Sequence, residues 1–514
     1  MSNYDAILIG AGHNGLVAAA YLAKAKKKVL ILERRSVPGG TLASESFGDS
    51  TLDPIWPGGQ LRPDIIKDLK LTLPRGIERT SFTSLLGQGD SLVLASDSSK
   101  AAEAIAHFSQ KDAARWPEFV RFMDKSARIL DTAYSTLMPR LPKNFSLAEG
   151  YGLLELGLEL RLAGRKDMLN FIRAIPMTAQ ELLDEYFESD MVKGAVASVG
   201  IHGLTLGPWS AGTGFTLIHN WLNRGGLSNA QTQASDIATE LINAAKNFGA
   251  EIRTESEVTR ILVDNYTVKG VALASGEEIS ARAVLSGVDP KRTLLGLVGA
   301  VNLPPEFVWK VQSIKMRGSV AKIHLLTDGN HGLPSGTLVV APSTKYLEQA
   351  YDAAKYGEIS ERPYLEVTTS GKVVSIHFQF APYALNSGVQ ELAPATATAS
   401  RRTPELWNEK RDFLETLAIH TLAEHFPNLK SSIKNQKSLT PLDLESVYGL
   451  TEGDLNHGQL LLDQFLFMRP MPGYSNHKTP IDNLYLCGSG VHGGGGVSGA
   501  AGRNAAKVVK ANAF

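Results

Sequence analysis

The sequence predicts an α/β protein whose first layer is a parallel sheet covered by helices. Three stretches of the 514-residue chain predict this fold. Residues 1–40 pass from an apolar segment through glycines into a helix and a second apolar segment, residues 251–286 hold short apolar segments separated by turns, and residues 483–503 lead through glycines into a helix. Because these stretches lie far apart in the chain, we expect one domain to be assembled from discontinuous segments.

The opening stretch predicts a strand, a glycine turn and a helix. Tyr4–Ile9 is a short apolar run, as in a buried parallel strand, and it precedes the motif Gly10-Ala11-Gly12-His13-Asn14-Gly15 and the helix-forming residues 16–24. In such a motif Gly10 permits the tight turn, Gly12 lets a pyrophosphate approach the backbone, and Gly15 lets the helix pack on the strand. The helix N-terminus offers N–H groups to phosphates. The pattern predicts a Rossmann-like dinucleotide site.

The next residues favour FAD over NAD as the dinucleotide. The apolar run Val29–Leu32 ends in Glu33, where a carboxylate can accept hydrogen bonds from an adenosine ribose. Arg34 follows directly, and Gly39, Gly40 and Thr41 come soon after. A second glycine pair lets another backbone segment close over a long bent cofactor. This arrangement resembles the extended FAD site of the flavoprotein oxidoreductase and amine oxidase superfamily.

Composition limits the class and the location of the protein. With a formal net charge of +0 and a pI near 7.2, the protein has no overall positive potential that would attract nucleic acid. Cys487 is the single cysteine, which excludes a C-x-x-C redox pair and favours a reducing compartment. Because the first strand starts almost at once and no apolar run has the length to span a bilayer, we expect a cytoplasmic protein. Peripheral contact with a membrane stays open.

The stretches between the two ends predict a second unit with α+β character. Strands of a second sheet are expected at 320–326, 336–340 and 373–380, another strand at 87–95, and helices at 61–69, 97–137, 167–188 with a break near Pro176, 191–199, 216–222, 231–248 and 405–425. Residues 41–60, 200–214 and 393–402 are expected to be loops, the second of them lining a cavity. In 153–162 the alternation of leucines favours a strand and the residue types favour a helix; we expect a helix.

We therefore expect a discontinuous FAD-binding domain at 1–69, 227–290 and 441–514. The expected substrate domain comprises 70–226 and 291–440. Strands at 251–254, 258–263, 268–273, 278–281 and 283–286 are expected to form a meander within the first domain.

The closing stretch predicts a second cofactor-binding element. Leu484–Cys487 is an apolar strand, and it leads into Gly488-Ser489-Gly490-Val491-His492, four glycines that end at Gly496, and Val497-Ser498-Gly499 before the helix Ala500–Asn512. Such a glycine run lets the backbone lie against a flat aromatic ring. If the ring is a flavin, the helix start presents N–H groups to its pyrimidine carbonyl, where reduction places negative charge.

Together the two ends resemble FAD-dependent oxidoreductases of the bacterial phytoene desaturase type, within the amine oxidase superfamily. GAGHNG at 10–15, LLDEYFESDMVKG at 182–194 and DQFLFMRPMP at 463–472 are similar to the carotene-ketolase-like and pyridine-nucleotide-disulfide-oxidoreductase-domain relatives. The resemblance covers nearly the whole chain and implies non-covalent FAD. The cofactor-binding residues that it and the motifs indicate are Gly10, Gly12, His13, Asn14, Gly15, Glu33, Arg34, Gly39, Gly40, Thr41, Val258, Gly488, Ser489, Gly496, Val497 and Ser498. Thr41 stands where many relatives have Arg or Ala, and Val258 matches a valine that touches adenine, although a plain core role is nearly as good an interpretation.

The resemblance implies desaturation, isomerisation or oxidation at C–C or C=C bonds of an apolar, carotenoid- or isoprenoid-like substrate, by hydride transfer to flavin. Oxygen, a quinone or a nicotinamide would be the electron acceptor. We expect an apolar cleft formed by 153–162, 191–199 and 373–380. A flavin amine oxidase, which would need an aromatic cage near the last strand, and a non-enzymatic interaction protein that retains the fold are the alternatives. The nearby Phe465, Phe467 and Tyr474 neither establish nor exclude such a cage.

No catalytic residue is identified from the sequence. His202, His457 and His492 are candidate bases, and a structural role is the more common one for each such histidine. Some desaturases of this kind are thought to need no protein base, because a stabilised cation can lose its proton to water.

Overall fold

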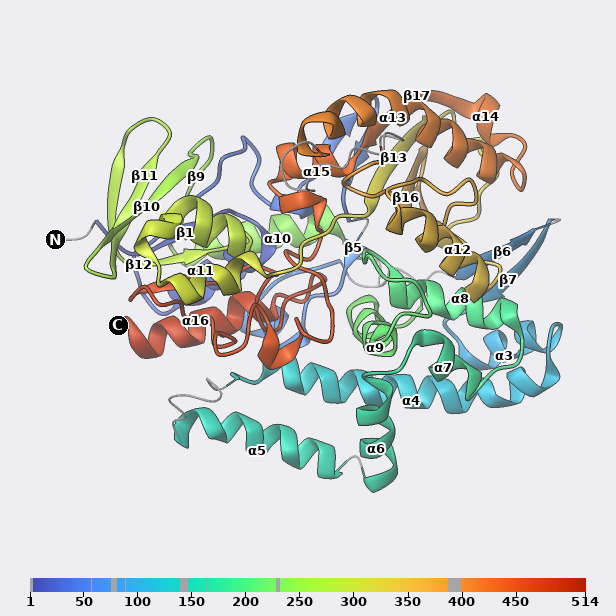
Figure 1. Cartoon of the computed structure of the whole chain (residues 1–514), viewed down its shortest axis with the longest axis horizontal. Coiled ribbons are helices and arrows are strands. Elements are labelled where there is room, and N and C mark those ends of the chain that lie inside the picture. The colour runs from blue at the N-terminus through green and yellow to red at the C-terminus, as the bar shows by residue number, and fades with distance from the viewer. Residues whose placement is uncertain are drawn as a thin grey trace.

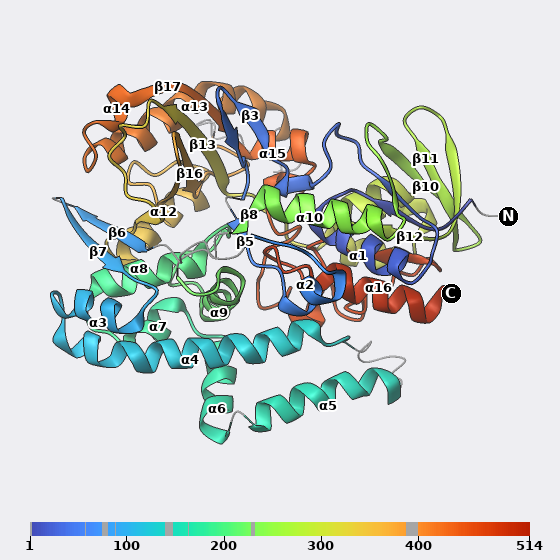
Figure 2. The same ribbon diagram turned by 180° about the vertical axis from the view of Figure 1, so that it is seen from behind.

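The computed structural model describes residues 3–56, 58–74, 81–87, 89–138, 147–162, 164–227, 232–386 and 399–514. Within these residues the chain forms two seven-stranded sheets and a layer of helices, in the α/β class that the sequence predicts. Figure 1 shows the first sheet at the end of the molecule that holds both termini, the second sheet at the other end, and helices α4 to α7 below them. Figure 2 shows the same arrangement from behind. No helix in these described ranges has the length and apolar character needed to cross a bilayer.

The first sheet has the order β10-β11-β12-β1-β2-β9, with β18 also paired to β12. Its strands are β1 (Tyr4–Ile9), β2 (Val29–Leu32), β9 (Glu251–Arg253), β10 (Val258–Asp264), β11 (Thr267–Leu273), β12 (Glu278–Ser286) and β18 (Leu484–Leu486). β9, β2, β1, β12 and β18 run parallel, while β10, β11 and the first half of β12 form an antiparallel meander. Two predictions are wrong in detail. The strands expected at 278–281 and 283–286 are one strand, because the buried–exposed alternation continues through the exposed Arg282, and 251–254 pairs with β2 instead of joining the meander.

Three helices cover one face of this sheet. α1 (His13–Lys24), α10 (Ala234–Asn247) and α16 (Ala500–Asn512) share a buried cluster with Leu8 and Ile31 of the strands. Ile7 and Leu30 point to the opposite face, where the meander, η2 (Arg292–Gly299) and α11 (Pro305–Gln312) cover them. Both faces of the parallel strands are buried, which explains their continuous apolar sequence.

The second sheet has the order β17-β13-β16-β15-β14-β6-β7. Its strands are β6 (Phe82–Gly87), β7 (Asp90–Leu94), β13 (Val320–Thr327), β14 (Thr337–Val340), β15 (Leu365–Ser370), β16 (Val373–Gln379) and β17 (Ile433–Leu439). The strands expected at 320–326, 336–340 and 373–380 all belong to it. α13 (Ala399–Ala423) packs on one face through Trp407 and Leu414, and it begins earlier than the predicted 405. The other face meets the helical layer.

The helical layer consists of seven helices in the described part of the chain. They are α3 (Ser98–Ala106), α4 (Gln110–Ser135), α5 (Leu147–Leu162), α6 (Arg165–Ala174), α7 (Ala179–Asp184), α8 (Asp190–Ile201) and α9 (Thr213–Arg224). The helix prediction for 153–162 is confirmed, as is the break near Pro176. Thr178 and Glu181 form a complete capping box at the start of α7, which satisfies two backbone N–H groups of that helix end.

The expected loop at 41–60 is wrong in part. Gly40–Leu42 forms a turn of 3-10 helix, β3 (Glu45–Phe47) and β4 (Ser50–Leu52) form a hairpin, and β5 (Gly58–Gly59) pairs with β8 (Thr232–Gln233). Gly48 and Asp49, residue types that are typical of loops, form the turn between these two strands. Of the loop expected at 393–402, residues 393–398 lie outside the described residues and 399–402 begin α13.

Candidate functional site

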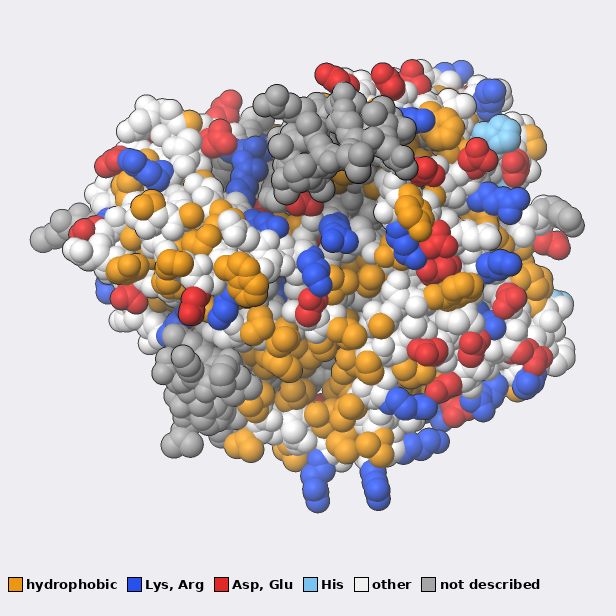
Figure 3. Space-filling model, viewed as in Figure 1, with side chains coloured by type: hydrophobic (Ala, Val, Ile, Leu, Met, Phe, Trp, Pro, Cys, Tyr) orange, Lys and Arg blue, Asp and Glu red, His pale blue; other side chains and the backbone are white. Residues whose placement is uncertain are grey.

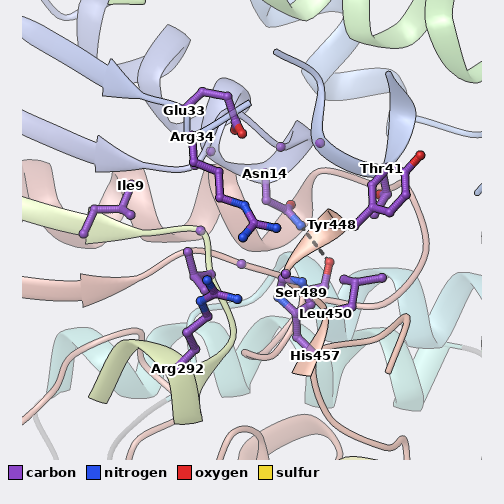
Figure 4. Close-up of a pocket in the computed structure, with 18 of the residues that line it drawn as sticks. Ile9, Asn14, Glu33, Arg34, Thr41, Arg292, Tyr448, Leu450, His457 and Ser489 are labelled. Carbon is purple, nitrogen blue, oxygen red and sulfur yellow. Dashed lines mark hydrogen bonds between the residues drawn. The ribbon is translucent and has the colours of Figure 1, made fainter. Parts of the chain in front are cut away.

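A cleft with about 1080 Å³ of empty space lies at the carboxyl ends of the parallel strands. Glu33 follows β2, Gly287 follows β12 and Gly488 follows β18, so three chain segments meet at one edge of the first sheet. Figure 4 shows side chains from these segments converging on the cleft. Ligands of open α/β sheets bind at this edge.

Most of the residues indicated by the sequence line this cleft. They are Gly10, Gly12, His13, Asn14, Gly15, Glu33, Arg34, Gly40, Thr41, Val258, Gly488, Ser489 and Gly496. Gly39, Val497 and Ser498 lie behind the lining: Gly39 N donates to Ala11 O at 2.9 Å, Val497 packs against Gly59, and Ser498 O accepts from Arg62 N at 3.2 Å. Their contact with a cofactor stays a prediction.

The glycine turn leaves its backbone open to a ligand. Gly10 has φ +89°, a conformation that favours glycine, and a Cβ at Gly15 would lie 2.4 Å from Gly10 O. A Cβ at Gly12, in contrast, would meet nothing within 4 Å. Gly12 begins α1 without a capping side chain, so N–H groups of the first turn are available to an anion.

Glu33 is buried and held by backbone donors. Its Oε2 accepts from Ala11 N at 2.8 Å and its Oε1 from Arg35 N at 3.0 Å. Each carboxylate oxygen has a second lone pair, so Glu33 can also accept hydrogen bonds from a diol in the cleft. The backbone contacts fix the orientation that such binding requires.

Two arginines add positive charge to the same cleft. Arg34 donates to Ser446 O at 3.0 Å and to Val447 O at 2.7 Å, and Figure 4 shows it facing Arg292 across the cleft. Burial, followed by the nearby Arg292, lowers the pKa of Arg34. Neither guanidinium has a carboxylate within ion-pair distance among the described residues. This pair suits a negatively charged ligand group, and sequence analysis missed Arg292 because it lies far from any glycine motif.

The closing segment meets the opening one at the other side of the cleft. Asn14 Nδ2 donates to Ser489 Oγ at 3.2 Å, and Asn14 Oδ1 accepts from Gly502 N at 3.2 Å. A Cβ at Gly488 would lie 2.5 Å from Gly287 O, so this crossing needs glycine. Burial lowers the pKa of His13 to about 4, which keeps the imidazole neutral at pH 7.

A second, polar pocket adjoins the cleft at Trp56, which lines both. It has about 360 Å³ of empty space and is lined by Asp53, Ile55, Trp56, His202, Lys322, His324, Glu366, Thr368, Ser375, Ile376 and His377. Its polar side chains come mainly from one face of β13, β15 and β16. The alternate residues Ile323, Val374 and Phe378 pack on the other face, under α13.

An ion pair neutralises the carboxylate of this pocket. Glu366 accepts from both guanidinium nitrogens of Arg224, at 2.9 and 3.1 Å, and both side chains are buried. His202 Nδ1 lies 3.3 Å from Glu366 Oε2. Although burial acts in the opposite direction, Arg224 and His202 hold the pKa of Glu366 well below its usual range.

The three candidate histidines lie in three different surroundings. His202 lines the polar pocket and His457 lines the cleft. His492 is buried, and its Nε2 donates to Ala133 O and Thr136 O at 3.0 Å, a structural arrangement. Sequence analysis missed Lys322, His324, Glu366 and His377. The sequence signal for these residues is that charged residues and histidines stand at alternate positions of otherwise apolar strands.

The expected apolar lining differs from the structure. Strand 373–380 turns Ser375, His377 and Gln379 toward the helical layer, and α8 is buried within that layer. Leu154 and Leu162 of α5 are more than two-thirds exposed on the outer surface. The apolar segments therefore either pack in the core or lie on the outer surface. The residues that line the pocket are polar side chains of the sheet.

The three aromatic residues considered for an amine oxidase cage lie outside the two cavities. Phe465 packs on Phe215 with ring centroids 4.6 Å apart, Tyr474 packs on Phe307 at 4.7 Å, and Phe467 is 46% exposed. None of the three lines the cleft or the polar pocket.

Comparison with known proteins agrees with this geometry. A family model described as NAD(P)-binding Rossmann-like domain matches residues 8–56. Pyridine nucleotide-disulfide oxidoreductase domain-containing protein 2 of Rattus norvegicus is 32% identical, over 98% of this chain and 93% of that protein. A lycopene-forming phytoene desaturase of Paracoccus sp. is 24% identical, over 97% and 95%.

A solved structure of a putrescine oxidase triple mutant shares the fold, with a TM-score of 0.57 and 14% identity over 99% of both chains. The full-length match at 32% identity, together with the glycine-built cleft, decides the assignment. The chain belongs to the family of pyridine nucleotide-disulfide oxidoreductase domain-containing protein 2, FAD-dependent oxidoreductases of the phytoene desaturase type.

Proposed function

We propose that the chain binds FAD non-covalently in the cleft and oxidises C–C bonds of an apolar, isoprenoid-like substrate. The observation that carries this proposal is the meeting of the glycine turn, Glu33 and the segment Gly488–Gly496 at one sheet edge. FAD would supply an acceptor for a hydride from the substrate. The relative named phytoene desaturase supports the substrate class.

The chain's own residues would divide the binding of the cofactor. Glu33 would hold the ribose, Gly12 and the start of α1 the pyrophosphate, and Gly496 with the start of α16 the flavin. Val258 would contact adenine. The open space at Gly12, the backbone-held Glu33 carboxylate and the positive φ of +64° at Gly496 all fit these roles.

We assign the FAD-binding domain to 1–69, 227–290 and 441–514, and the substrate domain to 70–226 and 291–440. The first sheet lies wholly in the former segments, and the second sheet lies in the latter. Residues of both domains line the polar pocket, which meets the cleft at Trp56. The substrate would therefore react where the two domains meet.

The test begins with the colour of the purified protein, which should be yellow and release FAD on acid precipitation. Phytoene in liposomes and putrescine would then be added separately to the oxidised protein without oxygen. Bleaching of the flavin by phytoene supports the proposal, and bleaching by putrescine alone replaces it with an amine oxidase. A colourless protein that takes up no FAD would refute it.

We further propose a cytoplasmic location and peripheral contact with a membrane through α5 and α6. Leu154, Leu158 and Leu162 are 71%, 57% and 73% exposed, and Leu169 and Ile172 are each 50% exposed. Figure 3 shows apolar side chains gathered on the lower part of this face, with basic side chains at its lower edge. Apolar residues beside Lys and Arg are typical of helices that lie in a membrane interface.

Flotation with liposomes would test this contact. The double variant Leu158→Ser/Leu162→Ser should lose binding. Val301→Ser removes a valine that is 93% exposed elsewhere and serves as the matched control. Equal flotation of all three proteins would contradict the proposal.

A further inference from the structure

Lys322 is a buried amine without a counter-ion. It lies on β13 at 4% exposure, and its Nζ is 2.9 Å from His377 Nδ1. Among the described residues no carboxylate lies within ion-pair distance of it. A buried ammonium without a paired charge is costly, so burial shifts the equilibrium toward the neutral amine, which becomes the main form above about pH 8. Burial lowers the pKa of Lys322 to about 8, with Glu366 opposing that shift and Arg224 adding to it.

A chain of hydrogen bonds fixes how Lys322 points. Gln379 Oε1 accepts from Gly203 N at 2.8 Å, and Gln379 Nε2 donates to Leu204 O at 2.6 Å, which sets the amide orientation. Gln379 Oε1 is therefore also the acceptor for His377 Nε2, at 2.8 Å. The Nδ1 of the neutral imidazole is left as an acceptor, and it takes an N–H of Lys322. The remaining positions of the amine are free to face the pocket.

The other titratable groups of the pocket are already engaged. Glu366 is paired with Arg224, and His202 stacks on His377 with ring centroids 4.0 Å apart. The pKa values of both imidazoles are lowered by burial.

Two more titratable groups face the pocket from its other elements. His324 Nε2 donates to Pro54 O at 3.0 Å and its Nδ1 contacts Ser375 Oγ at 3.0 Å, and burial lowers its pKa to about 3. Asp53 has its pKa raised to about 6 by burial. Lys322 and Asp53 are thus the groups of this pocket that can exchange a proton near neutral pH without losing an ion pair. Of the two, Lys322 is the one that the hydrogen bonds of His377 and Gln379 orient.

We propose that Lys322 is the proton-transfer residue of the reaction, and that His377 and Gln379 are its positioning residues. This inference rests on the proposed function. A C–H bond of the substrate breaks, its proton forms an N–H bond on the neutral Lys322 Nζ, and its electron pair becomes the π bond of the new alkene. FAD, when bound, would supply the acceptor for the hydride of the neighbouring carbon, and the ammonium of Lys322 would later return its proton to water.

A substrate-free measurement tests the protonation of Lys322. The unfolded lysine has a pKa near 10.5, so between about pH 8 and pH 10.5 the unfolded state binds more protons and the wild type gains stability as pH rises. The stability of the wild type relative to Lys322→Met should therefore rise across this range and stay constant just below pH 8. A difference that does not change from pH 7 to pH 10 overturns the proposal.

A kinetic measurement tests the proton transfer itself. Anaerobic flavin reduction by phytoene should slow about 100-fold or more in Lys322→Met, the range for loss of an acid–base group, while FAD content is retained. Added methylamine should restore part of the rate in Lys322→Ala, and His377→Phe should shift the pH profile. Lys434→Met, at an exposed position of the edge strand β17, is the control and should keep the wild-type rate.

The outcomes separate the two proposals. A yellow wild type that phytoene does not bleach contradicts the proposed substrate, whatever the stability data show. A bleached wild type with Lys322→Met within tenfold of its rate overturns the role of Lys322 alone.

Discussion

The cofactor cleft and the polar pocket share Trp56, yet they are built in opposite ways. The cleft is formed largely by backbone, at glycines where a Cβ would strike another main chain, as at Gly15 and Gly488. The pocket is formed by side chains from three strands, from the loop that holds Asp53 and Trp56, and from His202 just after α8. At such glycines an added methyl group forces the backbone to move, whereas in the pocket the loss of one charged side chain leaves its buried partner unpaired.

The largest effect should come from breaking the ion pair of the pocket. Arg224→Met leaves Glu366 buried without its partner, which should lower the free energy of unfolding by about 3–5 kcal/mol. Chemical denaturation would measure it. The double variant Arg224→Met/Glu366→Gln should recover much of the loss, and a double variant as unstable as the single one would show that packing dominates over charge.

The matching change in the cleft is Gly15→Ala. Its Cβ would lie 2.4 Å from Gly10 O, so the turn must shift, at about 1–3 kcal/mol, and FAD uptake should be lost. Flavin absorbance and thermal unfolding would report both effects. Gly157→Ala is the control, because a Cβ there meets nothing within 4 Å on the exposed side of α5. Normal FAD content in Gly15→Ala would show that this helix–turn contact is not needed.

Glu33→Ala should have a smaller effect, mainly on FAD affinity, and it also removes the acceptor of Ala11 N and Arg35 N. Loss of charge-assisted hydrogen bonds of about 1.5–3 kcal/mol should weaken FAD binding roughly tenfold or more, with the flavin spectrum unchanged. Titration of apoprotein with FAD would measure the affinity. Glu306→Ala, an exposed acid on α11, is the control. Equal affinity in both variants would remove Glu33 from the ribose site.

The smallest effect is expected where the opening segment contacts the closing segment through Asn14. Asn14→Ala removes the hydrogen bonds to Ser489 and Gly502, which should cost about 1 kcal/mol in unfolding free energy. Thermal unfolding of the FAD-loaded protein would detect it. A loss larger than that of Arg224→Met would reverse the ranking of the two regions.

This contrast explains what could be predicted from the sequence. The cleft was predictable because glycines with fixed spacing encode it locally, and Gly10 to Gly15, Glu33 and Gly488 lie where the motifs placed them. The expected helix 500–512 has the bounds of α16. Arg292 and Tyr448 of the same cleft were not predictable, because no local pattern links them to a glycine turn.

The pocket could not be predicted for a related reason. Lys322, Glu366 and His377 stand on three strands, and their proximity depends on the order β13-β16-β15. The alternation of 373–380 identified a strand correctly but did not say which face meets a cavity. The sequence analysis expects this strand to line an apolar cleft, whereas the sheet packs the apolar face of the strand under α13.

The joining of the chain ends has a consequence for biosynthesis. β18 is the strand that completes one side of β12, and α16 packs on α1 through Gly502, where a Cβ would lie 2.1 Å from Asn14 O. The glycine turn at residues 10–15 therefore leaves the ribosome long before residues 484–512, which complete its surroundings. The cofactor site stays incomplete while the intervening chain is made, and a chain that stops before residue 484 should not retain the cofactor.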